Sequence, residues 1–547
     1  MKIRFRGTIP LLFSALLAGS AAIPLSASAE WKHIGYMGDL NNDQELNVAD
    51  LVIMKRHLLG IEPMTDSNSY HVQNSYIGIN GADGFQAGEY FVTADINQDG
   101  AVDIFDFVEL RKAIVNDSAL WVWQWETEYI VPDDPIEENG EFIGASVNDV
   151  YKFMPSQGNG KMLIIYADFA DCKFSYLPTT DEIEKIAFGE ENSDNKLYPW
   201  ESISAFFKRS SKGALDLTGK AYHYSTGNSV NNYYQVKGQK ALMTEACKAL
   251  DSKINFSEFD GNNDGYIDTL VLIVPGQTSN DTWWPASVQF ANDNYVYDGM
   301  KIGHMITGNC QINSSVDYRD FVSTLTHETG HCMGLPDYYR YDKNSDADGL
   351  HGTAGSELMD DTGGDLSCVS KLHLGWYKTD QVQVYDSSSG TQSFILYNAQ
   401  TSKGNTIIIP CGDLDSRYHS EYMMIEYTTK QANNSSPPWY VSMGEGIRVY
   451  HVDASLYNNG WWTSFRYASG SEFTDNYEGR RFIRLIDDKK SDNIYKTGAV
   501  IDGNISGFHW YDSNGRQTID TGLTIEIGEK NNDSYTVTIK NNAFANN

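Results

Sequence analysis

Positive charge is scarce in this sequence. Its 547 residues include 41 Lys and Arg against 73 Asp and Glu, which gives a formal net charge of −32. A nucleic-acid-binding protein needs a basic surface, and a protein that docks on anionic lipid needs basic clusters. The charge balance therefore argues against both classes. It fits a solvating surface, a cation-binding protein, or both.

Long apolar runs are missing after the N-terminus. The chain begins with Lys2, Arg4 and Arg6, continues with a short apolar stretch and reaches a small-residue Ala-Ser-Ala sequence that ends at Ala29. This order is typical of a cleaved signal peptide. We therefore predict a signal peptide over residues 1–29 and a secreted, extracellular protein. No later stretch approaches the roughly 18 apolar residues of a membrane-spanning helix, so we expect no transmembrane segment in the mature chain.

Cysteine is also rare, with six in the whole chain and no C-x-x-C spacing. That absence argues against a zinc ribbon and against a dithiol redox site. The sequence does not choose between disulfides and buried thiols, and it gives no pairing. The six are Cys172, Cys247, Cys310, Cys332, Cys368 and Cys411.

A repeat with an offset of 56 residues occupies the N-terminal fifth of the chain. Each copy places oxygen-bearing side chains at loop positions 1, 3, 5, 9 and 12, and an apolar stretch with helical spacing follows. Ca²⁺ prefers six to eight oxygen ligands, and the backbone carbonyl at position 7 adds one. The candidate ligands are Asp39, Asn41, Asp43, Glu45, Asn47 and Asp50 in the first copy and Asp95, Asn97, Asp99, Ala101, Asp103 and Asp106 in the second.

This repeat resembles a dockerin, the duplicated calcium loop–helix module that attaches enzymes to a scaffold. We assign residues 30–118 to it. The resemblance implies a small all-α domain with two calcium ions. It also implies a partner, the cohesin domain of an extracellular scaffoldin, as in cellulosomes that degrade polysaccharides.

Residues 119–144 are predicted to form a linker, because their second half is acidic and contains Pro132 and Pro135. Three tryptophans, Trp121, Trp123 and Trp125, stand at its start. Packing against the dockerin helices explains them better than a sugar-binding platform does.

The main chemical motif is H-E-T-G-H-C-M-G-L-P-D at residues 327–337. On a helix, His327 and His331 project from one side, four residues apart, and both can bind a metal through their imidazole nitrogens. Glu328 lies beside them, where it can take a proton from a metal-bound water. Gly334 can turn the chain back, so that Asp337 returns as a third ligand and leaves a fourth position open. Three ligands of this kind suit zinc.

The residues around this motif resemble the immune inhibitor A family of secreted bacterial metalloproteases over most of residues 145–547. The resemblance implies that His327, His331 and Asp337 bind one catalytic zinc and that Glu328 is the general base. Its supporting stretches are residues 162–169, 204–211, 215–219, 264–268 and 446–453.

The same resemblance implies a metzincin-like α/β catalytic domain over residues 145–380. Met359 is then the candidate for the methionine turn beneath the metal. His304, Tyr338 and Tyr377 are conceivable donors to an oxyanion, and the sequence does not rank them.

Two further regions have weaker patterns. Asp260, Asn262, Asp264 and Asp268 form a third candidate calcium loop, although a plain turn explains them nearly as well. Short apolar runs separated by turn residues over 381–547 predict a C-terminal β-sandwich. We expect this domain to support the catalytic domain, with substrate positioning and carbohydrate contact (Trp439, Trp461, Trp462) as alternatives.

The sequence as a whole thus predicts a secreted multidomain zinc endopeptidase, attached to a scaffold by its dockerin. One alternative is a non-catalytic, dockerin-borne adhesin with a vestigial metal motif. Another is a polysaccharide hydrolase, which would need an Asp/Glu pair that the sequence does not reveal.

Overall fold

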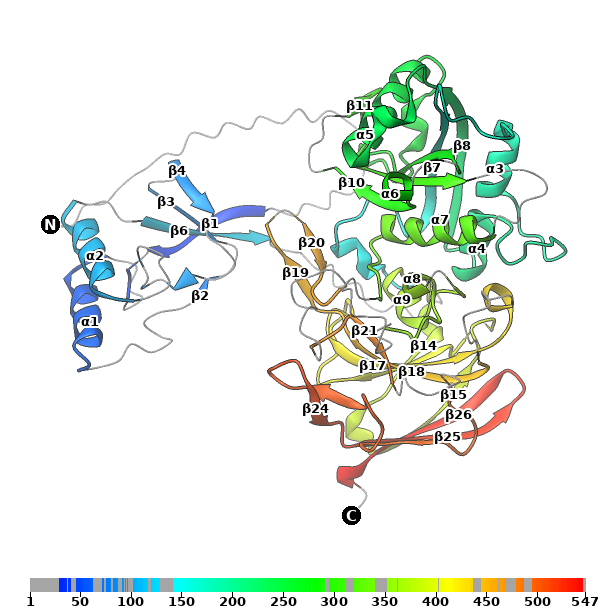
Figure 1. The fold of residues 1–547 in the computed structure, drawn as a ribbon. Helices are drawn as coiled ribbons and strands as arrows, with labels where there is room; N and C mark the ends of the chain where they lie inside the picture. Colours follow the sequence, from blue (N-terminus) through cyan, green and yellow to red (C-terminus); the bar gives the residue numbers. More distant parts are fainter. Residues whose placement is uncertain are drawn as a thin grey trace. The chain divides into compact units, whose positions relative to one another are not determined.

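The computed structural model divides into two compact units, Met1–Asp134 and Pro135–Asn547, which we call the N-terminal and C-terminal units (Figure 1). The structure describes residues 29–36, 38–40, 46–61, 71–72, 75–79, 82–86, 91–92, 94, 96, 102–116, 120–127, 141–276, 278, 280–290, 295–310, 319–339, 352–361, 363–401, 403–435, 444–460, 462–468, 479–486 and 494–544. The predicted signal peptide, apart from Ala29, lies outside these ranges.

Two helices of the N-terminal unit follow the two predicted calcium loops. Helix α1 spans Val48–Leu58 and α2 spans Ile104–Asn116. A small core of Leu40, Met54, Ala94, Ile96 and Leu110 lies between them. These helices therefore occupy equivalent places in the two copies of the repeat.

Strands also occur in this unit, so the all-α expectation was wrong. Strand β6 lies in the first part of the predicted linker, where Trp121, Trp123 and Trp125 recur with the period of two that a strand requires. It pairs with β1 and β3 in a sheet of order β1-β6-β3-β4. The strands are β1 (Ala29–Tyr36), β2 (His71–Val72), β3 (Ser75–Ile79), β4 (Ala82–Gln86), β5 (Phe91–Val92) and β6 (Leu120–Thr127).

The first half of the C-terminal unit is built on a five-stranded sheet of order β10-β13-β9-β7-β8. Strands β7, β8, β9 and β13 are parallel, and β10 joins β13 antiparallel at the edge. The buried strands β7 and β9 are apolar on both faces, as expected for a parallel sheet covered on both sides. The five strands of this sheet are β7 (Gly158–Asp168), β8 (Leu215–Ser225), β9 (Thr269–Pro275), β10 (Ala286–Gln289) and β13 (His304–Cys310). Strands β11 (Val296–Tyr297) and β12 (Met300–Lys301) pair with each other.

Helices α3, α4 and α7 share one apolar core with this sheet, and α5 packs in a second core on its other face (Figure 1). The sheet therefore holds α7, which carries the H-E-x-x-H motif, against a rigid support. The helices are α3 (Thr180–Phe188), α4 (Ile203–Ser210), α5 (Gln235–Leu250), α6 (Asn280–Trp283), α7 (Arg319–Cys332), α8 (Leu358–Asp361) and α9 (Cys368–His373).

The remainder of the C-terminal unit is mostly β, as predicted. A sheet of order β14-β16-β17-β18-β21 and a sheet of order β15-β26-β25-β22 enclose a common apolar core. The strands are β14 (Val382–Val384), β15 (Thr391–Tyr397), β16 (Thr406–Pro410), β17 (Glu421–Thr428), β18 (Gly446–Asp453), β19 (Leu456–Asn458), β20 (Thr463–Phe465), β21 (Ile483–Leu485), β22 (Val500–Ile501), β23 (His509–Tyr511), β24 (Gln517–Asp520), β25 (Leu523–Asn531) and β26 (Ser534–Asn541).

The first of these sheets is buried on both faces. Met423 and Val449 point into the core between the two sheets, whereas Met424 and Tyr450 join the core that also contains α4, α7 and α9. The β-rich part is therefore continuous with the part that carries the metal motif.

All six cysteines are free thiols, and four of them are buried. Among the described residues, none of the helices has the length and apolar character needed to cross a membrane.

Candidate metal centres

Helix α7 brings His327, Glu328 and His331 together. Their candidate ligand atoms all lie within 4.8 Å of one another. The helix ends at Cys332, and Gly334 then adopts a left-handed conformation with φ of +97°. This turn returns the chain so that Asp337 faces the two histidines. The helix and the turn together thus bring residues ten positions apart in the chain next to one another.

Asp337 lies where a third ligand is needed. Its Oδ1 is 3.0 Å from His327 Nε2 and 3.3 Å from His331 Nε2. Ligand atoms about 2 Å from a tetrahedral zinc ion lie roughly 3.3 Å from one another. The Asp337 oxygen therefore lies from each imidazole at about the separation expected between two ligands of one metal ion.

The hydrogen bonds of the other ring nitrogens show which atoms would face the metal. Nδ1 of His327 donates to the carbonyl of Leu358 at 2.7 Å, and Nδ1 of His331 donates to the carbonyl of Leu335 at 2.8 Å. Each Nε2 is thus directed at the Asp337 carboxylate. A neutral imidazole with its proton on Nδ1 has no N–H at Nε2 to donate to that carboxylate. The arrangement therefore requires a second proton on the ring or a cation between the ring and the carboxylate.

The shifted pKa values of His331 and Asp337 agree with this geometry. Burial lowers the pKa of His331, but the Asp337 carboxylate outweighs it and raises that pKa to about 9. Burial likewise works to raise the pKa of Asp337, yet the nearby charge of His331 and the hydrogen bonds from both imidazoles hold it well below its usual range. The pocket therefore attracts positive charge.

Met359 lies beneath this pair of histidines, as the Met-turn hypothesis requires. It is fully buried, and a Cβ added to Gly330 of α7 would lie 2.5 Å from its Sδ. The carbonyl of Met359 accepts the backbone N–H of Tyr338 at 2.9 Å. The turn thus contacts the helix and also the segment that carries Asp337.

Glu357 holds this turn in place, and its role was not predicted from the sequence. The Glu357 carboxylate accepts the N–H groups of Met359 and Ser367 and the hydroxyl of Ser370. Burial raises the pKa of Glu357 to about 8, although these donors oppose the shift. The available sequence signal was an acid directly before the candidate Met-turn. The partners of Glu357 could not be predicted from it, because Ser367 and Ser370 lie further along the chain, at the start of α9.

The three conceivable oxyanion donors do not lie in the open part of the site. His304 is buried and its Nε2 contacts Thr269 and Cys332, while the Tyr338 hydroxyl pairs with Ser370. Tyr377 is buried in the core. Cys332 is likewise a buried thiol.

A cleft of about 460 Å³ opens beside His331 and Glu328. One wall comes from the edge strand β10, and another comes from β20 in the β-rich part of the chain. Its described lining residues are Val150, Tyr151, Trp284, Pro285, Ala286, Ser287, Gln289, Glu328, His331, Gly334, Leu335, Pro336, Asp337, Tyr339, Trp462, Thr463, Ser464, Phe465 and Ala468.

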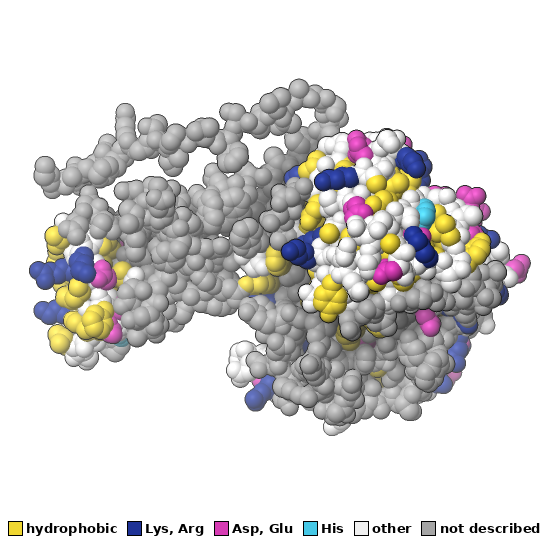
Figure 2. All heavy atoms as spheres, turned by 45° about the horizontal axis from the view of Figure 1, so that its top comes forward, with side chains coloured by type: hydrophobic (Ala, Val, Ile, Leu, Met, Phe, Trp, Pro, Cys, Tyr) yellow, Lys and Arg dark blue, Asp and Glu magenta, His cyan; other side chains and the backbone are white. Residues whose placement is uncertain are grey.

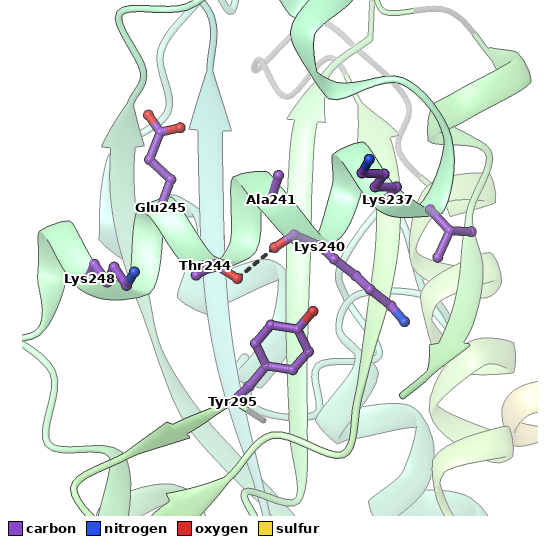
Figure 3. Close-up of a pocket in the computed structure, with 8 residues that line it drawn as sticks. Lys237, Lys240, Ala241, Thr244, Glu245, Lys248 and Tyr295 are labelled. Carbon is purple, nitrogen blue, oxygen red and sulfur yellow. Dashed lines mark hydrogen bonds between the residues drawn. The ribbon is translucent and has the colours of Figure 1, made fainter. Parts of the chain in front are cut away.

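A larger hollow of about 790 Å³ lies elsewhere, on α5. Figure 3 shows Lys237, Lys240 and Lys248 spread along this helix without converging on one point, and Thr244 donates to the helix carbonyl of Lys240 at 2.8 Å. On the face shown in Figure 2, Lys and Arg side chains are dispersed among acidic and apolar ones. This open surface has no convergent chemistry comparable to the α7 cleft.

The two N-terminal loops close in the same way in each copy. Asp50 accepts the N–H groups of Leu40 and Asn47 at 2.9 Å each. Asp106 accepts those of Ile96 and Asp103 at 2.7 and 2.8 Å. Asn47 and Asp103 cap the following helices, and Asp39 is buried. The other candidate ligands, Asn41, Asp43, Glu45, Asp95, Asn97, Asp99 and Ala101, lie outside the described residues.

The exposed apolar residues of α1 and α2 repeat with the same offset. Val48 and Val52 correspond to Ile104 and Val108, and all four are at least 41% exposed. Apolar side chains that stay exposed at equivalent places mark a binding surface better than scattered ones do. The sequence pattern alone did not reveal their exposure.

The third candidate calcium loop is held by its own backbone. Asp260 accepts the N–H groups of Asp264 and Gly265, and Asp268 accepts those of Gly261 and Lys161. Asn262 donates its side-chain amide to Asp264. Burial raises the pKa of Asp268 to about 7. A plain turn explains these contacts, and calcium binding here stays a prediction.

Comparisons with known proteins support the N-terminal interpretation. Residues 37–115 match the dockerin type I domain model. Dockerin domains bind calcium and the cohesin of a scaffoldin, so this domain indicates attachment to a cohesin-bearing scaffold and an extracellular, cellulosome-type location. None of the comparisons supports the immune inhibitor A resemblance.

One solved structure shows a distant similarity to this chain. No curated protein matches it. Seven solved chains match, among them the crystal structure of wild-type OgpA from Akkermansia muciniphila. That similarity has 10% identity and a TM-score of 0.23, and it covers 55% of this chain and 91% of OgpA. At these values it assigns neither fold nor function.

Proposed function

We propose that the C-terminal unit is a zinc-dependent endopeptidase of the metzincin type, which the dockerin attaches to a scaffold. The arrangement of His327, His331 and Asp337 is the observation that supports it most. Both Nδ1 atoms are committed to carbonyls, so both Nε2 atoms converge with a carboxylate on one point. Such a site has the donors and the spacing for zinc.

The chain's own residues have distinct parts in this proposal. When bound, zinc would supply an acidified water and polarise a substrate carbonyl. Glu328 lines the cleft beside His331, so it can accept the proton of the attacking water and pass it to the leaving amine. The Met359 turn and Gly334 hold the ligands in place.

The cleft wall suggests how a peptide would bind. Strand β10 is the last strand of its sheet, and Ala286, Ser287 and Gln289 of this strand line the cleft. An extended peptide can pair with such an edge through backbone hydrogen bonds. This mode of binding is independent of side-chain sequence, so it suits protein substrates.

The charges of the cleft favour cleavage within a chain. The described lining residues include no Lys or Arg to hold a substrate carboxylate, and their only acids are Glu328 and Asp337. An exopeptidase needs a fixed charge to recognise a chain end. We therefore propose internal cleavage.

The test combines metal analysis with casein and gelatin cleavage. We expect about one zinc per chain, and we expect Glu328→Gln to lower kcat by at least about 100-fold while zinc stays bound, because removing a general base has effects of this size. Glu529→Gln changes an exposed acid in β25 and should retain activity.

Folded protein without zinc would overturn the proposal. Zinc-loaded protein that cleaves no substrate would instead support the alternative of a dockerin-borne binding protein.

A further inference from the structure

Two tryptophans stand exposed at the α7 cleft. Trp284 precedes β10 and is 66% exposed, and Trp462 precedes β20 and is 47% exposed. Tryptophan is highly buried on average in folded proteins, because its side chain has a large apolar surface. Their exposure in one cleft, on segments far apart in the chain, indicates that both are available to bind a ligand.

The wall that carries Trp462 is firmly held. Strands β19 and β20 form a hairpin, and the carbonyl of Thr463 accepts the N–H of Tyr151 at 2.7 Å. Phe465 at the end of β20 is buried, with its ring 4.3 Å from that of Phe482. The hairpin therefore presents Trp462 on a fixed base.

The cleft offers little to charged groups. Apart from Glu328, His331 and Asp337, which belong to the metal centre, its described lining is aromatic, apolar or neutral and polar. A charged substrate side chain would lose water there without gaining an opposite charge, which is unfavourable. A bulky sugar would also find no charged side chain there, outside the metal centre, with which its hydroxyls could form charge-assisted hydrogen bonds.

We propose that Trp284 and Trp462 are specificity-determining residues that bind aromatic side chains next to the cleaved bond. The inference rests on the proposed peptidase function and narrows its substrates to uncharged, aromatic-containing segments of polypeptide chains. Strand β10 holds the substrate backbone, and the two indoles contact its side chains. The β-rich part of the chain thus contributes to substrate selection as well as to support.

Three short peptides that differ at the residues beside the bond test this inference. One carries Phe or Tyr there, one carries Ala, and one carries Ala beside a serine with an attached neutral sugar. We expect the wild type to prefer the aromatic peptide. Trp462→Ala and Trp284→Ala should each lower kcat/KM for it by about tenfold, the effect of losing roughly 1.4 kcal/mol of contact.

For the alanine peptide, kcat/KM should change less than about twofold in either variant, because the lost contact is to the aromatic side chain. Tyr176→Ala, which removes an aromatic residue that is 46% exposed and does not line the cleft, should change neither value. Thermal unfolding shows whether the variants keep the wild-type fold, and zinc content shows whether they keep the site.

Several results would overturn the inference alone. These are equal cleavage of the aromatic and alanine peptides by the wild type, equal losses for both peptides in the tryptophan variants, and a requirement for the sugar. If no peptide or protein is cleaved by zinc-loaded wild type, the proposed function itself fails.

Discussion

The calcium loops of the dockerin and the proposed zinc site differ in what holds them together. Among the described residues of the N-terminal unit, five buried apolar side chains form the core between α1 and α2, with partly buried ones packed against them. In the C-terminal unit, α7 lies in a core shared with a five-stranded sheet, with helices α3, α4, α8 and α9 and with a second sheet. A small domain with little core needs staples such as metal ions, whereas a large core forms its site in advance. We infer that calcium binding stabilises the fold of the N-terminal unit. In the C-terminal unit, the fold itself forms the proposed zinc site.

The largest effect that we expect comes from removing calcium from the two N-terminal loops. A calcium-selective chelator should unfold α1 and α2 and abolish cohesin binding, because Asp50 and Asp106 would lose the ions that balance their buried charge. Circular dichroism and cohesin pull-down with the full chain measure both changes. Removal of zinc should leave the C-terminal unit folded.

Unfolding of the C-terminal unit on removal of zinc alone would contradict the comparison. So would α1 and α2 that stay folded without calcium. Asp50→Asn with Asp106→Asn provides a second route to the same state, since both acids close their loops through backbone N–H groups.

The next effect is a pH dependence of the C-terminal unit. The pKa of Glu357 is raised to about 8 in the folded chain, so the folded state holds a proton that the unfolded state has already released near neutral pH. This contribution to stability is complete below the unfolded pKa and is lost as the pH rises through about 8. One such group can change the free energy of unfolding by up to about 1.4 kcal/mol per pH unit.

Urea unfolding between pH 6.5 and 8 measures this slope in wild type and in Glu357→Gln. The variant should be less stable at low pH, because its amide faces the N–H of Met359, and it should have a shallower slope. Equal slopes in the two proteins would contradict the role of Glu357. The other titrating groups contribute alike to both proteins, so the difference isolates one carboxyl.

The smallest effect concerns the turn after α7. Gly334→Ala should lower the free energy of unfolding by about 1–3 kcal/mol, since a side chain there is strained by the left-handed backbone and would approach Val150 to 2.7 Å. Gly213→Ala is a matched control with φ of +81° and open space around it. Zinc affinity should fall only in Gly334→Ala. Equal losses in both variants would mean that the turn has no special link to the site.

Local patterns predicted the parts of the molecule that are local in the chain. The helix period places His327 and His331 on one side, a glycine turns the chain to Asp337, and the 56-residue repeat gives two equivalent helices. The dockerin type I match confirms the interpretation of the repeat. Short-range geometry is enough for such features.

Features that join distant segments were not predictable in the same way. Ser370 reaches Glu357 from another helix, and Thr463 meets Tyr151 across more than half of the chain. The strand β6 was missed for a different reason, because we took its tryptophans for helix-packing residues and overlooked their alternation. The oxyanion candidates failed because burial, which decides their access, is a property of the whole fold.

The sheet that contains β17 and β18 has a consequence for the order of events during synthesis. One of its faces completes the core around α7, and its other face needs β25 and β26, which end at Asn541. The face of this sheet that belongs to the core between the two sheets therefore stays uncovered until β25 and β26 have been synthesised, although the core around α7 needs no residue beyond Leu485. We expect the sheet to reach its final stability only when those two strands have joined it.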